Sequence, residues 1–405
     1  MLRSEDVIFD VIVVGAGPGG ATCAWKCAEL GLKVLLLDRA PSLPRYKPCG
    51  GGIPSSLVRH VEGLEPEKFT DLTVTKLRHT WRGKSPVLAE MTCSDGKPAE
   101  VWMVQRPRFD TYLVEKAKSA GAELKLGVKV SDITVTSEDV TVTAGEESWT
   151  ARYVVGADGA KGIVGARAGL RLGKRWGIAR EVEIPYEYTE TLAPSLSGAG
   201  GAILRDACYL DYGSVKNGYA WIFPKAGYLS VGAGMLVPRQ PKAEQNVGKI
   251  LMDAIHTMLG SVDMTYPTGM DAPKLWAHPI PFWTGMEPLA TKDGRVLLVG
   301  DAAGVVQPLF GEGIQYAVRT GAVAAQHLAA STTLQYTEAV KTELAGEFDA
   351  ALRVGKVFHR TPYLSYRLGV KNPAGTKLVG RLMSGEVSLE HLEQRIYDKL
   401  KNPFK

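Results

Sequence analysis

Residues 11–20 read Val-Ile-Val-Val-Gly-Ala-Gly-Pro-Gly-Gly, and this stretch decides the fold. Four apolar residues predict a buried parallel strand, and the glycines after them predict a tight turn that leads into a helix. Gly15 permits the turn, Gly17 lets the backbone approach a pyrophosphate, and Gly20 allows close packing of helix on strand. The segment therefore predicts the first unit of a Rossmann-like α/β fold.

The next strand supplies an acidic group for the same site. Residues 34–37 are apolar throughout, as in a strand covered on both faces, and they lead directly to Asp38. A carboxylate there can accept hydrogen bonds from an adenosine ribose, while the helix expected at 18–30 points its N-terminus at the phosphates. A glycine turn without a ligand is the alternative. The strand, helix and acid together favour dinucleotide binding.

A second segment, nearly 300 residues later, indicates which dinucleotide is bound. Residues 295–304 read Arg-Val-Leu-Leu-Val-Gly-Asp-Ala-Ala-Gly, a buried strand that ends at Asp301. NAD would need only the first site, whereas an aspartate after a late strand suits the ribityl and pyrophosphate part of a flavin. A new helix N-terminus is expected at 311–314, where it could stabilise the charge of a reduced flavin near N1 and C2=O. The two segments together predict FAD.

Bulk composition fits a globular enzyme of two domains. The chain has 405 residues, 45% hydrophobic and 22% charged, with a formal net charge of +5. No basic tract with interleaved aromatic residues is present, which argues against a nucleic-acid partner. Weak attraction to anionic lipid headgroups stays open.

Targeting and metal signals are missing from the sequence. No apolar stretch reaches the ~18 residues of a membrane span, and the first residues do not resemble a signal peptide. We therefore expect a cytoplasmic protein that is peripheral to the membrane at most. Five cysteines argue against a disulfide framework, and no cysteine or histidine spacing predicts a metal site.

The order of segments predicts a discontinuous fold. We expect an α/β protein with a Rossmann-like FAD-binding domain, an antiparallel-sheet substrate-binding domain and a helical C-terminal region. Strands are expected near 73–81 and 87–91, a helix at 106–120, and strand-like structure through most of 175–285. The expected boundaries are 1–75, 104–175 and 286–335 for the FAD-binding domain, 76–103 and 176–285 for the substrate-binding domain, and 336–405 for the C-terminal region.

Two further stretches carry a family resemblance. Residues 46–53 read Tyr-Lys-Pro-Cys-Gly-Gly-Gly-Ile, and residues 218–224 read Gly-Tyr-Ala-Trp-Ile-Phe-Pro. With the FAD segments, the helix start at 106–110 and Asp158-Gly159 in this order, the chain resembles the para-hydroxybenzoate hydroxylase-like flavoproteins. The two further stretches resemble signatures of the geranylgeranyl reductase family, which saturates isolated double bonds in polyprenyl chains. The resemblance covers about residues 7–330.

The resemblance implies roles for particular residues. Arg106 is the natural phosphate partner, since a planar guanidinium matches anionic oxygens. Cys49 would lie beside the isoalloxazine, and Tyr219 and Trp221 would shape a cavity for the prenyl chain. The positions that match FAD contacts of the family are Gly20, Asp38, Arg39, Cys49, Gly50, Arg106, Val130, Asp301, Gly313 and Ile314.

One segment departs from the aromatic hydroxylases of this fold. They usually follow Asp-Gly with a serine and then an arginine, where this chain has Gly162 and Gly165, with Arg167 displaced. Because the segment is associated with handling NAD(P)H, the electron donor stays open between transiently docking NAD(P)H and a small redox protein such as ferredoxin. Asp158 itself is either a turn residue or a cofactor contact.

The catalytic candidates each have a structural alternative. Cys49 is the candidate acid or charge-positioning group, or else a small residue in a tight glycine turn. Tyr219 and Trp221 alternate along a predicted strand and so face the same side, where they could line a cavity or pack in a core.

We therefore expect an FAD-dependent reductase that saturates isolated C=C bonds of geranylgeranyl or polyprenyl chains in a lipid, quinone or pigment precursor. An FAD-dependent monooxygenase or halogenase of the same fold is one alternative. A halogenase would carry Trp-x-Trp-x-Ile-Pro, where residues 219–224 read Tyr-Ala-Trp-Ile-Phe-Pro. A noncatalytic electron-transfer flavoprotein is the other.

Overall fold

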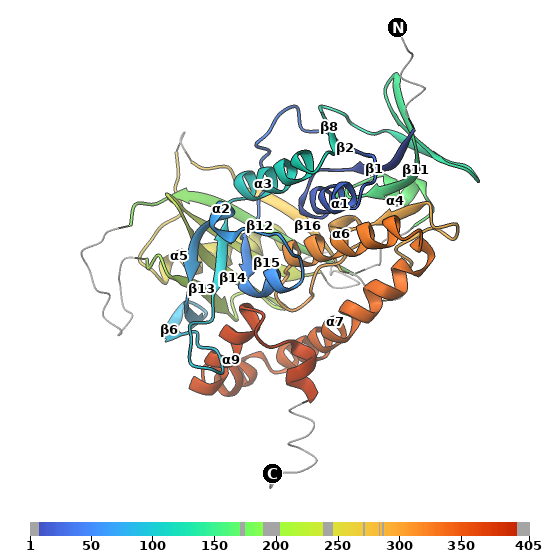
Figure 1. The fold of residues 1–405 in the computed structure, drawn as a ribbon. Helices are drawn as coiled ribbons and strands as arrows, with labels where there is room; N and C mark the ends of the chain where they lie inside the picture. The colour runs from blue at the N-terminus through green and yellow to red at the C-terminus, as the bar shows by residue number, and fades with distance from the viewer. Residues whose placement is uncertain are drawn as a thin grey trace. The chain divides into compact units, whose positions relative to one another are not determined.

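The computed structural model describes residues 8–170, 175–188, 203–237, 246–269, 272–282, 284–285 and 287–394 (Figure 1). The chain divides into two compact units. Unit 1 comprises Met1–Lys47, Arg106–Arg175 and Ile280–Gly346. Unit 2 comprises Pro48–Gln105, Trp176–Pro279 and Glu347–Lys405. Both units are discontinuous in sequence, as predicted, and each is described by itself below.

Unit 1 is built on a seven-stranded sheet whose core is parallel. The strand order is β8-β2-β1-β11-β10-β9, with β17 paired to β11. β2, β1, β11 and β17 run parallel, and β10 and β9 add an antiparallel meander. The strands are β1 (Phe9–Val14), β2 (Val34–Asp38), β8 (Glu123–Leu126), β9 (Asp132–Val135), β10 (Val140–Ala144), β11 (Glu147–Gly156) and β17 (Val296–Leu298). This arrangement confirms the Rossmann-like prediction, with the strand before Asp301 joining the same sheet.

Three helices pack side by side in unit 1. α1 (Pro18–Glu29) lies between α3 (Arg106–Ser119) and α6 (Ile314–Ala329) (Figure 1). A Cβ atom at Gly321 would clash with the carbonyl oxygen of Gly19, and one at Gly19 would lie 3.0 Å from the carbonyl oxygen of Ala317. The backbones of α1 and α6 therefore touch, which only glycine at the crossing allows. The helices predicted at 18–30 and after Gly313 are confirmed.

Unit 2 contains a seven-stranded sheet of order β16-β12-β15-β14-β13-β5-β6 and a three-stranded sheet of order β3-β7-β4. In the larger sheet, β13 pairs in parallel with β5, whereas the pairs β12–β15, β15–β14, β14–β13 and β5–β6 are antiparallel. Its strands are β5 (Lys76–Trp81), β6 (Lys84–Glu90), β12 (Arg175–Pro185), β13 (Ala207–Tyr212), β14 (Gly218–Lys225), β15 (Tyr228–Leu236) and β16 (Trp276–Phe282). The smaller sheet comprises β3 (Gly52–Pro54), β4 (Thr70–Val74) and β7 (Val101–Val104).

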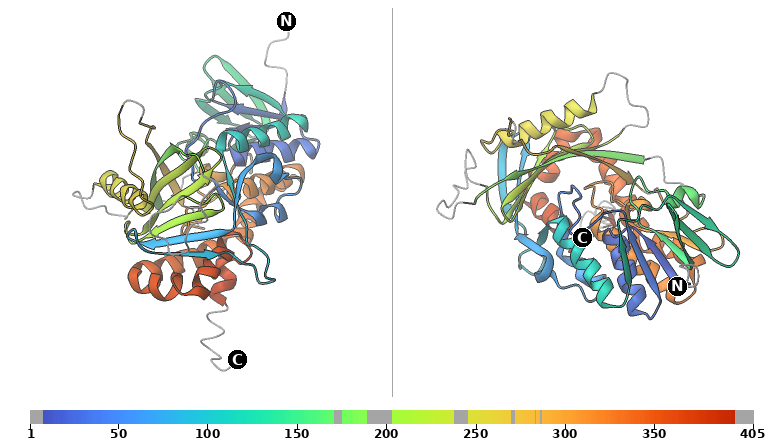
Figure 2. Two further views of the ribbon diagram at one scale, coloured as in Figure 1. Left: turned by 90° about the vertical axis from the view of Figure 1, so that its left-hand side faces the viewer. Right: turned by 90° about the horizontal axis from the view of Figure 1, so that it is seen from above.

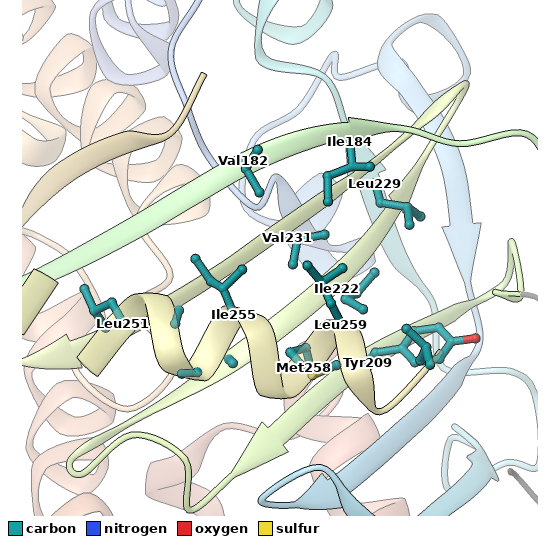
Figure 3. Close-up of a cluster of buried hydrophobic side chains, with 14 of the residues drawn as sticks. Val182, Ile184, Tyr209, Ile222, Leu229, Val231, Leu251, Ile255, Met258 and Leu259 are labelled. Carbon is teal, nitrogen blue, oxygen red and sulfur yellow. The ribbon is translucent and has the colours of Figure 1, made fainter. Parts of the chain in front are cut away.

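One face of the larger sheet is covered by α5 (Val247–Gly260) (Figure 2). Its buried residues Leu251, Ile255 and Leu259 meet Ile222 of β14 and Val231 of β15 in one apolar cluster (Figure 3). A helix in this region was not predicted, because the strands on either side dominate the pattern of 175–285. Parts of that stretch, 189–202 and 238–245, lie outside the described residues.

The C-terminal region is helical, as predicted. It comprises α7 (Tyr336–Arg360), α8 (Pro362–Ser365), a π-helical turn (Tyr366–Val370) and α9 (Pro373–Met383). In unit 2, α9 packs on β5 and β6 (Figure 2). None of the helices in the described ranges combines the length and the apolar character needed to cross a membrane.

The two units differ in detail from the boundaries expected from sequence. Residues 48–75 lie in unit 2, because β3 and β4 pair with β7 of that unit. The strand expected near 73–81 is two strands in different sheets, β4 and β5. Residues from Glu347 onward belong to unit 2, where they share a core with β5.

Replacing Ile255 by alanine should destabilise unit 2. The side chain is fully buried between α5 and the sheet, so its loss removes apolar contacts and leaves a cavity. We expect a loss of about 2–5 kcal/mol in the free energy of unfolding, measured by urea denaturation. Asp253→Ala on the exposed side of the same helix is the control and should cost less than about 1 kcal/mol. Equal losses in the two variants would contradict this packing.

Candidate functional site

The glycine turn of unit 1 brings backbone against backbone. Gly15 has φ of +106°, and a Cβ atom there would clash with the carbonyl oxygen of Ala157 at the end of β11. A Cβ atom at Gly20 would clash with the carbonyl oxygen of Gly15. These contacts press the start of α1 against the ends of β1 and β11, so the first N–H groups of α1 project from glycines that have no side chains of their own.

Asp38 holds this turn in place. Its carboxylate accepts hydrogen bonds from the N–H of Ala16 at 2.6 Å and from the N–H of Ala40 at 2.8 Å. Arg39 next to it is exposed. The backbone before the predicted contact Val130 runs beside the same strand end, where the N–H of Val128 donates to the carbonyl oxygen of Asp38 at 2.9 Å. The acid at the end of β2 thus orders the turn, and its remaining acceptor sites suit a ribose.

Two arginines share one aspartate next to the turn. Arg106 donates to Asp110 through Nε and Nη2, both at 2.8 Å, and Arg45 donates to the same carboxylate at 2.7 Å. A Cβ atom at Gly17 would lie 2.8 Å from Arg45 Nη2, so this guanidinium lies over the N-terminus of α1. Its Nε is buried without a hydrogen-bond partner in the described part of the chain. The cluster keeps one excess positive charge beside the helix N-terminus, which suits a phosphate.

Sequence reasoning missed Arg45. It named Arg106 as the phosphate partner because that position matches a family contact with FAD and a guanidinium suits anionic oxygens. Arg45 lies in a segment without regular structure between β2 and β3 and matches no such motif. Only the folded chain brings Arg45 over Gly17.

Asp301 lies where β17 ends, in a short 3₁₀ turn (Gly300–Ala302). Lys47 Nζ donates to its carboxylate at 2.8 Å. A Cβ atom at Gly313 would lie 3.5 Å from Asp301 Oδ1, so the acid faces the N-terminus of α6, which begins at Ile314. The structure therefore brings the predicted residues Asp301, Gly313 and Ile314 together, and it adds Lys47.

Asp158 serves as a turn residue in this structure. Its Oδ2 accepts hydrogen bonds from the N–H groups of Ile163 at 2.6 Å and Val164 at 3.0 Å, and burial raises its pKa. A Cβ atom at Gly162 would overlap that carboxylate, which is a physical reason for glycine where the hydroxylases have serine. Oδ1 of Asp158 is buried without a hydrogen-bond partner among the described residues, so a cofactor role stays a prediction.

These features fit FAD. A turn cleared of side chains, a cationic cluster with a free buried N–H, and an aspartate at a second helix N-terminus match a pyrophosphate and its flanking hydroxyl groups. The groups that would hold the pyrophosphate are the N-terminus of α1 and Arg45, with Arg106 behind, and Asp38 and Asp301 would take the two sugar portions.

In unit 2, the glycines after Cys49 lie flat on strand β14. A Cβ atom at Gly50 would lie 3.0 Å from the ring of Phe223. Gly51 has φ of +65°, and a Cβ atom there would lie 2.7 Å from Lys225 Nζ and would clash with the carbonyl oxygen of Val104. Only glycine fits at Gly51, and at Gly50 the absence of a side chain lets the loop contact the ring of Phe223, so the motif holds half-buried Cys49 directly above β14.

An aromatic row runs along β14 beneath this loop. The ring centroids of Tyr219 and Trp221 are 5.9 Å apart, and those of Trp221 and Phe223 are 6.2 Å apart. The prediction that Tyr219 and Trp221 face the same side is confirmed. Trp221 and Phe223 are buried in a core cluster, while Tyr219 is partly exposed at its edge. A cavity-lining role for these side chains stays a prediction.

A buried polar chain lies behind the row. Trp221 Nε1 donates to Ser230 Oγ at 3.2 Å, and Ser230 Oγ donates to Glu181 Oε1 at 3.2 Å. The backbone N–H of Cys49 also donates to the Glu181 carboxylate. Lys225 Nζ donates to the carbonyl oxygens of Gly51 at 3.2 Å and Val104 at 3.1 Å. The loop is thus held from below by one buried acid and one buried base.

Burial shifts the pKa values of Glu181 and Lys225 toward neutral pH. It raises the pKa of Glu181 to about 7, against the attraction of Lys225. It lowers the pKa of Lys225 to about 8, against the attraction of Cys49 and Glu181. Titratable groups with such shifts cluster at functional sites. Sequence reasoning missed both residues, because a single charge within an apolar strand has no periodic pattern that marks it.

Comparison with known proteins agrees with this chemistry. The FAD binding domain family matches residues 9–199. Geranylgeranyl diphosphate reductase of Rhodobacter capsulatus is 32% identical over 78% of this chain and 74% of its own length. Digeranylgeranylglycerophospholipid reductase 2 of Methanopyrus kandleri is 28% identical over 86% of each chain.

The chain belongs to the geranylgeranyl reductase family of FAD-dependent oxidoreductases. The crystal structure of a geranylgeranyl bacteriochlorophyll reductase-like protein from Thermoplasma acidophilum shares the fold, with a TM-score of 0.72, 19% identity and coverage of 98% of this chain and 96% of the other. The predicted family, fold class and FAD cofactor are therefore confirmed. The electron donor and the roles of individual site residues stay predictions.

Gly17→Val should abolish FAD binding. The new side chain would overlap the Arg45 guanidinium and cover the helix N-terminus that the pyrophosphate needs. We expect purified protein without flavin absorbance, and the same for Asp301→Ala. Gly31→Ala is the control, since its Cβ atom would meet open space, and it should retain FAD at a modest cost in stability. Normal flavin content in both site variants would refute this cofactor site.

Arg45→Ala should weaken FAD binding without abolishing it. One charge-assisted contact to phosphate is worth about 1.5–3 kcal/mol, which corresponds to roughly a 10- to 100-fold higher dissociation constant. Titration of the apoprotein with FAD measures this effect. Arg152→Ala, an exposed arginine of the same unit, should leave the constant unchanged. If Arg45→Ala also left the dissociation constant for FAD unchanged, the role of Arg45 would be limited to its ion pair with Asp110.

Proposed function

We propose that this chain saturates isolated C=C bonds of a geranylgeranyl or polyprenyl chain. The observation that carries the proposal is the Cys49 loop of unit 2, which lies on an aromatic strand above a buried lysine and glutamate. The chain that carries this loop belongs to an FAD-binding family. The named activities of the relatives from Rhodobacter capsulatus and Methanopyrus kandleri support the same substrate class.

Saturating an isolated alkene needs a hydride at one carbon and a proton at the other. Reduced FAD, when bound, supplies the hydride. The chain must then supply the proton, hold the alkene in one orientation and exclude water. Orientation alone can contribute up to ~7–11 kcal/mol to lowering such a barrier.

Cys49 is the proton donor in this proposal. Its Sγ–H bond breaks as the new C–H bond forms, which leaves a thiolate. Lys225 would stabilise that thiolate, since a negative Cys49 and a positive Lys225 attract each other, as the pKa of Lys225 reflects. Glu181 would keep the loop in place through the N–H of Cys49. Lys225 and Glu181 are positioning residues, because they act through Cys49.

The row formed by Tyr219, Trp221 and Phe223 would orient the apolar chain. Ser230 Oγ fixes the Trp221 ring by accepting a hydrogen bond from the indole N–H. Gly232 has no side chain and so leaves room for that ring. Aromatic walls suit a prenyl chain because they bury apolar surface and offer no nucleophile. The electron donor in this scheme is NAD(P)H or a small redox protein such as ferredoxin.

An anaerobic experiment tests the reaction. The bound flavin is reduced with dithionite, and its reoxidation is followed as geranylgeranyl diphosphate or a geranylgeranylated lipid is added. We expect reoxidation with a product mass gain of ~2 per saturated bond. A flavin that stays reduced until oxygen enters, followed by an oxygenated or halogenated product, would establish the alternative of a monooxygenase or halogenase. Reoxidation with a redox partner but without any product would indicate an electron-transfer protein.

Cys49→Ser should retain FAD and lose turnover. A serine hydroxyl fits the same space but is a far weaker acid, so we expect a loss of roughly 10²-fold or more in kcat, the usual scale of general acid catalysis. Stopped-flow reoxidation of the reduced variant by substrate measures this loss. Cys93→Ser, at a half-exposed cysteine elsewhere in unit 2, is the matched control. Unchanged turnover in Cys49→Ser would leave the cysteine a packing residue.

The pH dependence of kcat should report Lys225. Burial lowers the pKa of Lys225 to about 8, so its charge is present below that pH and is lost as pH rises through it. Turnover should fall with the loss of the charge that stabilises the thiolate, giving an alkaline limb near pH 8. Lys225→Met should have low turnover and lack this limb, whereas Lys292→Met, at an exposed lysine of unit 1, should keep it. A limb that persists in Lys225→Met would refute this role.

A further inference from the structure

The C-terminal helices expose an unusual group of apolar side chains. Val357, Tyr363, Leu364 and Leu368 are 69%, 54%, 53% and 64% exposed, and they are four of the nine large hydrophobic residues exposed in the described ranges. All four lie within twelve positions of the sequence. We call them the C-terminal patch. Scattered exposed leucines need no explanation, but several large apolar side chains exposed within one short segment do need one.

The segment that carries the patch is anchored firmly from behind. Tyr366 and Val370 are buried while Leu364 and Leu368 are exposed, so one apolar pair points inward and another points outward. Tyr366 Oη lies 3.0 Å from Nδ1 of fully buried His79, a ring whose pKa burial lowers to about 4. Nε2 of the same ring lies 3.2 Å from Thr376 Oγ1.

The hydroxyl of Thr376 closes this network by donating to the carbonyl oxygen of Val370 at 2.6 Å. The ring of Trp81 supports the patch directly, with its centroid 5.2 Å from that of Tyr363 and 5.3 Å from that of Tyr366. The exposed side chains are therefore presented by an ordered scaffold.

The charged residues of the segment that carries the patch have one sign. Residues 350–385 contain no aspartate or glutamate and seven lysines and arginines. Two of the seven are paired, Arg353 with Glu393 and Arg381 with Glu386. The other five are exposed, and no ion pair is recorded for them within the described ranges: Lys356, Arg360, Arg367, Lys371 and Lys377.

We propose that the C-terminal patch docks unit 2 onto the surface of a lipid bilayer that carries anionic headgroups. Basic side chains beside exposed Leu, Val and Tyr match the two layers of such a surface, which are negative headgroups and the apolar region beneath them. Tyrosine is suited to the boundary between these layers. The proposal does not depend on which reaction the chain catalyses.

Other occupants fit these features less well. A symmetric contact with a second copy of this chain would bring the same basic residues face to face, so their repulsion would oppose it. An acidic redox protein would satisfy the charges, but its surface would have to bury four exposed apolar side chains as well. Both occupants are outcomes of the test below.

Vesicle co-sedimentation of the FAD-loaded protein tests the proposal. The vesicles contain either phosphatidylcholine alone or equimolar phosphatidylcholine and phosphatidylglycerol, neither of which has a prenyl chain, so docking is measured independently of turnover. We expect at least ~10-fold stronger partitioning to the anionic vesicles, weakened by added salt. No association with anionic vesicles would overturn the proposal.

Two double variants separate the patch from the rest of the surface. Each should lower partitioning to anionic vesicles by ~10-fold or more. One combines Leu364→Ser with Leu368→Ser, and the other combines Arg367→Glu with Lys371→Glu. The matched controls are Leu334→Ser, at a leucine that is 62% exposed in unit 1, and Lys292→Glu, and they should bind as the parent does. Unchanged FAD content and Tm show that each variant is folded.

Four results would overturn the proposal. Patch variants could bind vesicles as well as the parent, or the controls could lose as much binding. A dimer in size-exclusion chromatography that the Leu364 and Leu368 replacements dissociate would assign the patch to contacts between copies. Reduction by ferredoxin that is lost in the Arg367 and Lys371 replacements, with vesicle binding intact, would assign it to a redox partner.

Discussion

Contact between backbones at glycines is the constraint on which unit 1 depends. The start of α1 lies so close to the ends of β1 and β11 that neither Gly15 nor Gly20 has room for a methyl group, and the same is true where Gly19 of α1 meets Gly321 of α6. A glycine within a helix destabilises it by roughly 0.5–1 kcal/mol relative to alanine, because it loses more conformational entropy on folding. Both α1 and α6 contain such glycines. What the close contact provides is a helix N-terminus that is free of side chains and beside which Arg45 can lie.

Unit 2 uses glycine for a different purpose. Gly50 and Gly51 let the Cys49 loop lie on β14, where their missing side chains leave room for Phe223 and for Lys225 Nζ. Burying a lysine and a glutamate is costly, and a well-packed apolar pair in their place is often at least as stable. Glu181 of β12 and Lys225 of β14 therefore add little to the stability of the sheet beneath Cys49. In the proposed reaction, Lys225 stabilises the thiolate of Cys49 and Glu181 positions its loop.

The candidate residues are divided between the two units. Unit 1 carries the glycine turn, the arginines and the aspartates that are predicted to hold FAD, and unit 2 carries Cys49, the aromatic row and the C-terminal patch. The folded chain also explains the departure from the aromatic hydroxylases at 162. Asp158 turns back to accept hydrogen bonds from Ile163 and Val164, and its carboxylate fills the space that a side chain at Gly162 would need.

The sequence by itself determined the Rossmann-like strand, turn and helix, the strand that leads to Asp301 and the helix that begins at Ile314, because each has a local pattern of apolar residues and glycines. It also determined the family, through the Cys-Gly stretch and the aromatic strand. Only the tertiary structure decided that Arg45 lies over Gly17, that Lys47 pairs with Asp301, and that Glu181 and Lys225 lie under Cys49. These pairs come from segments that are distant in sequence, and a single charged residue acquires its meaning only from the neighbours that folding brings to it.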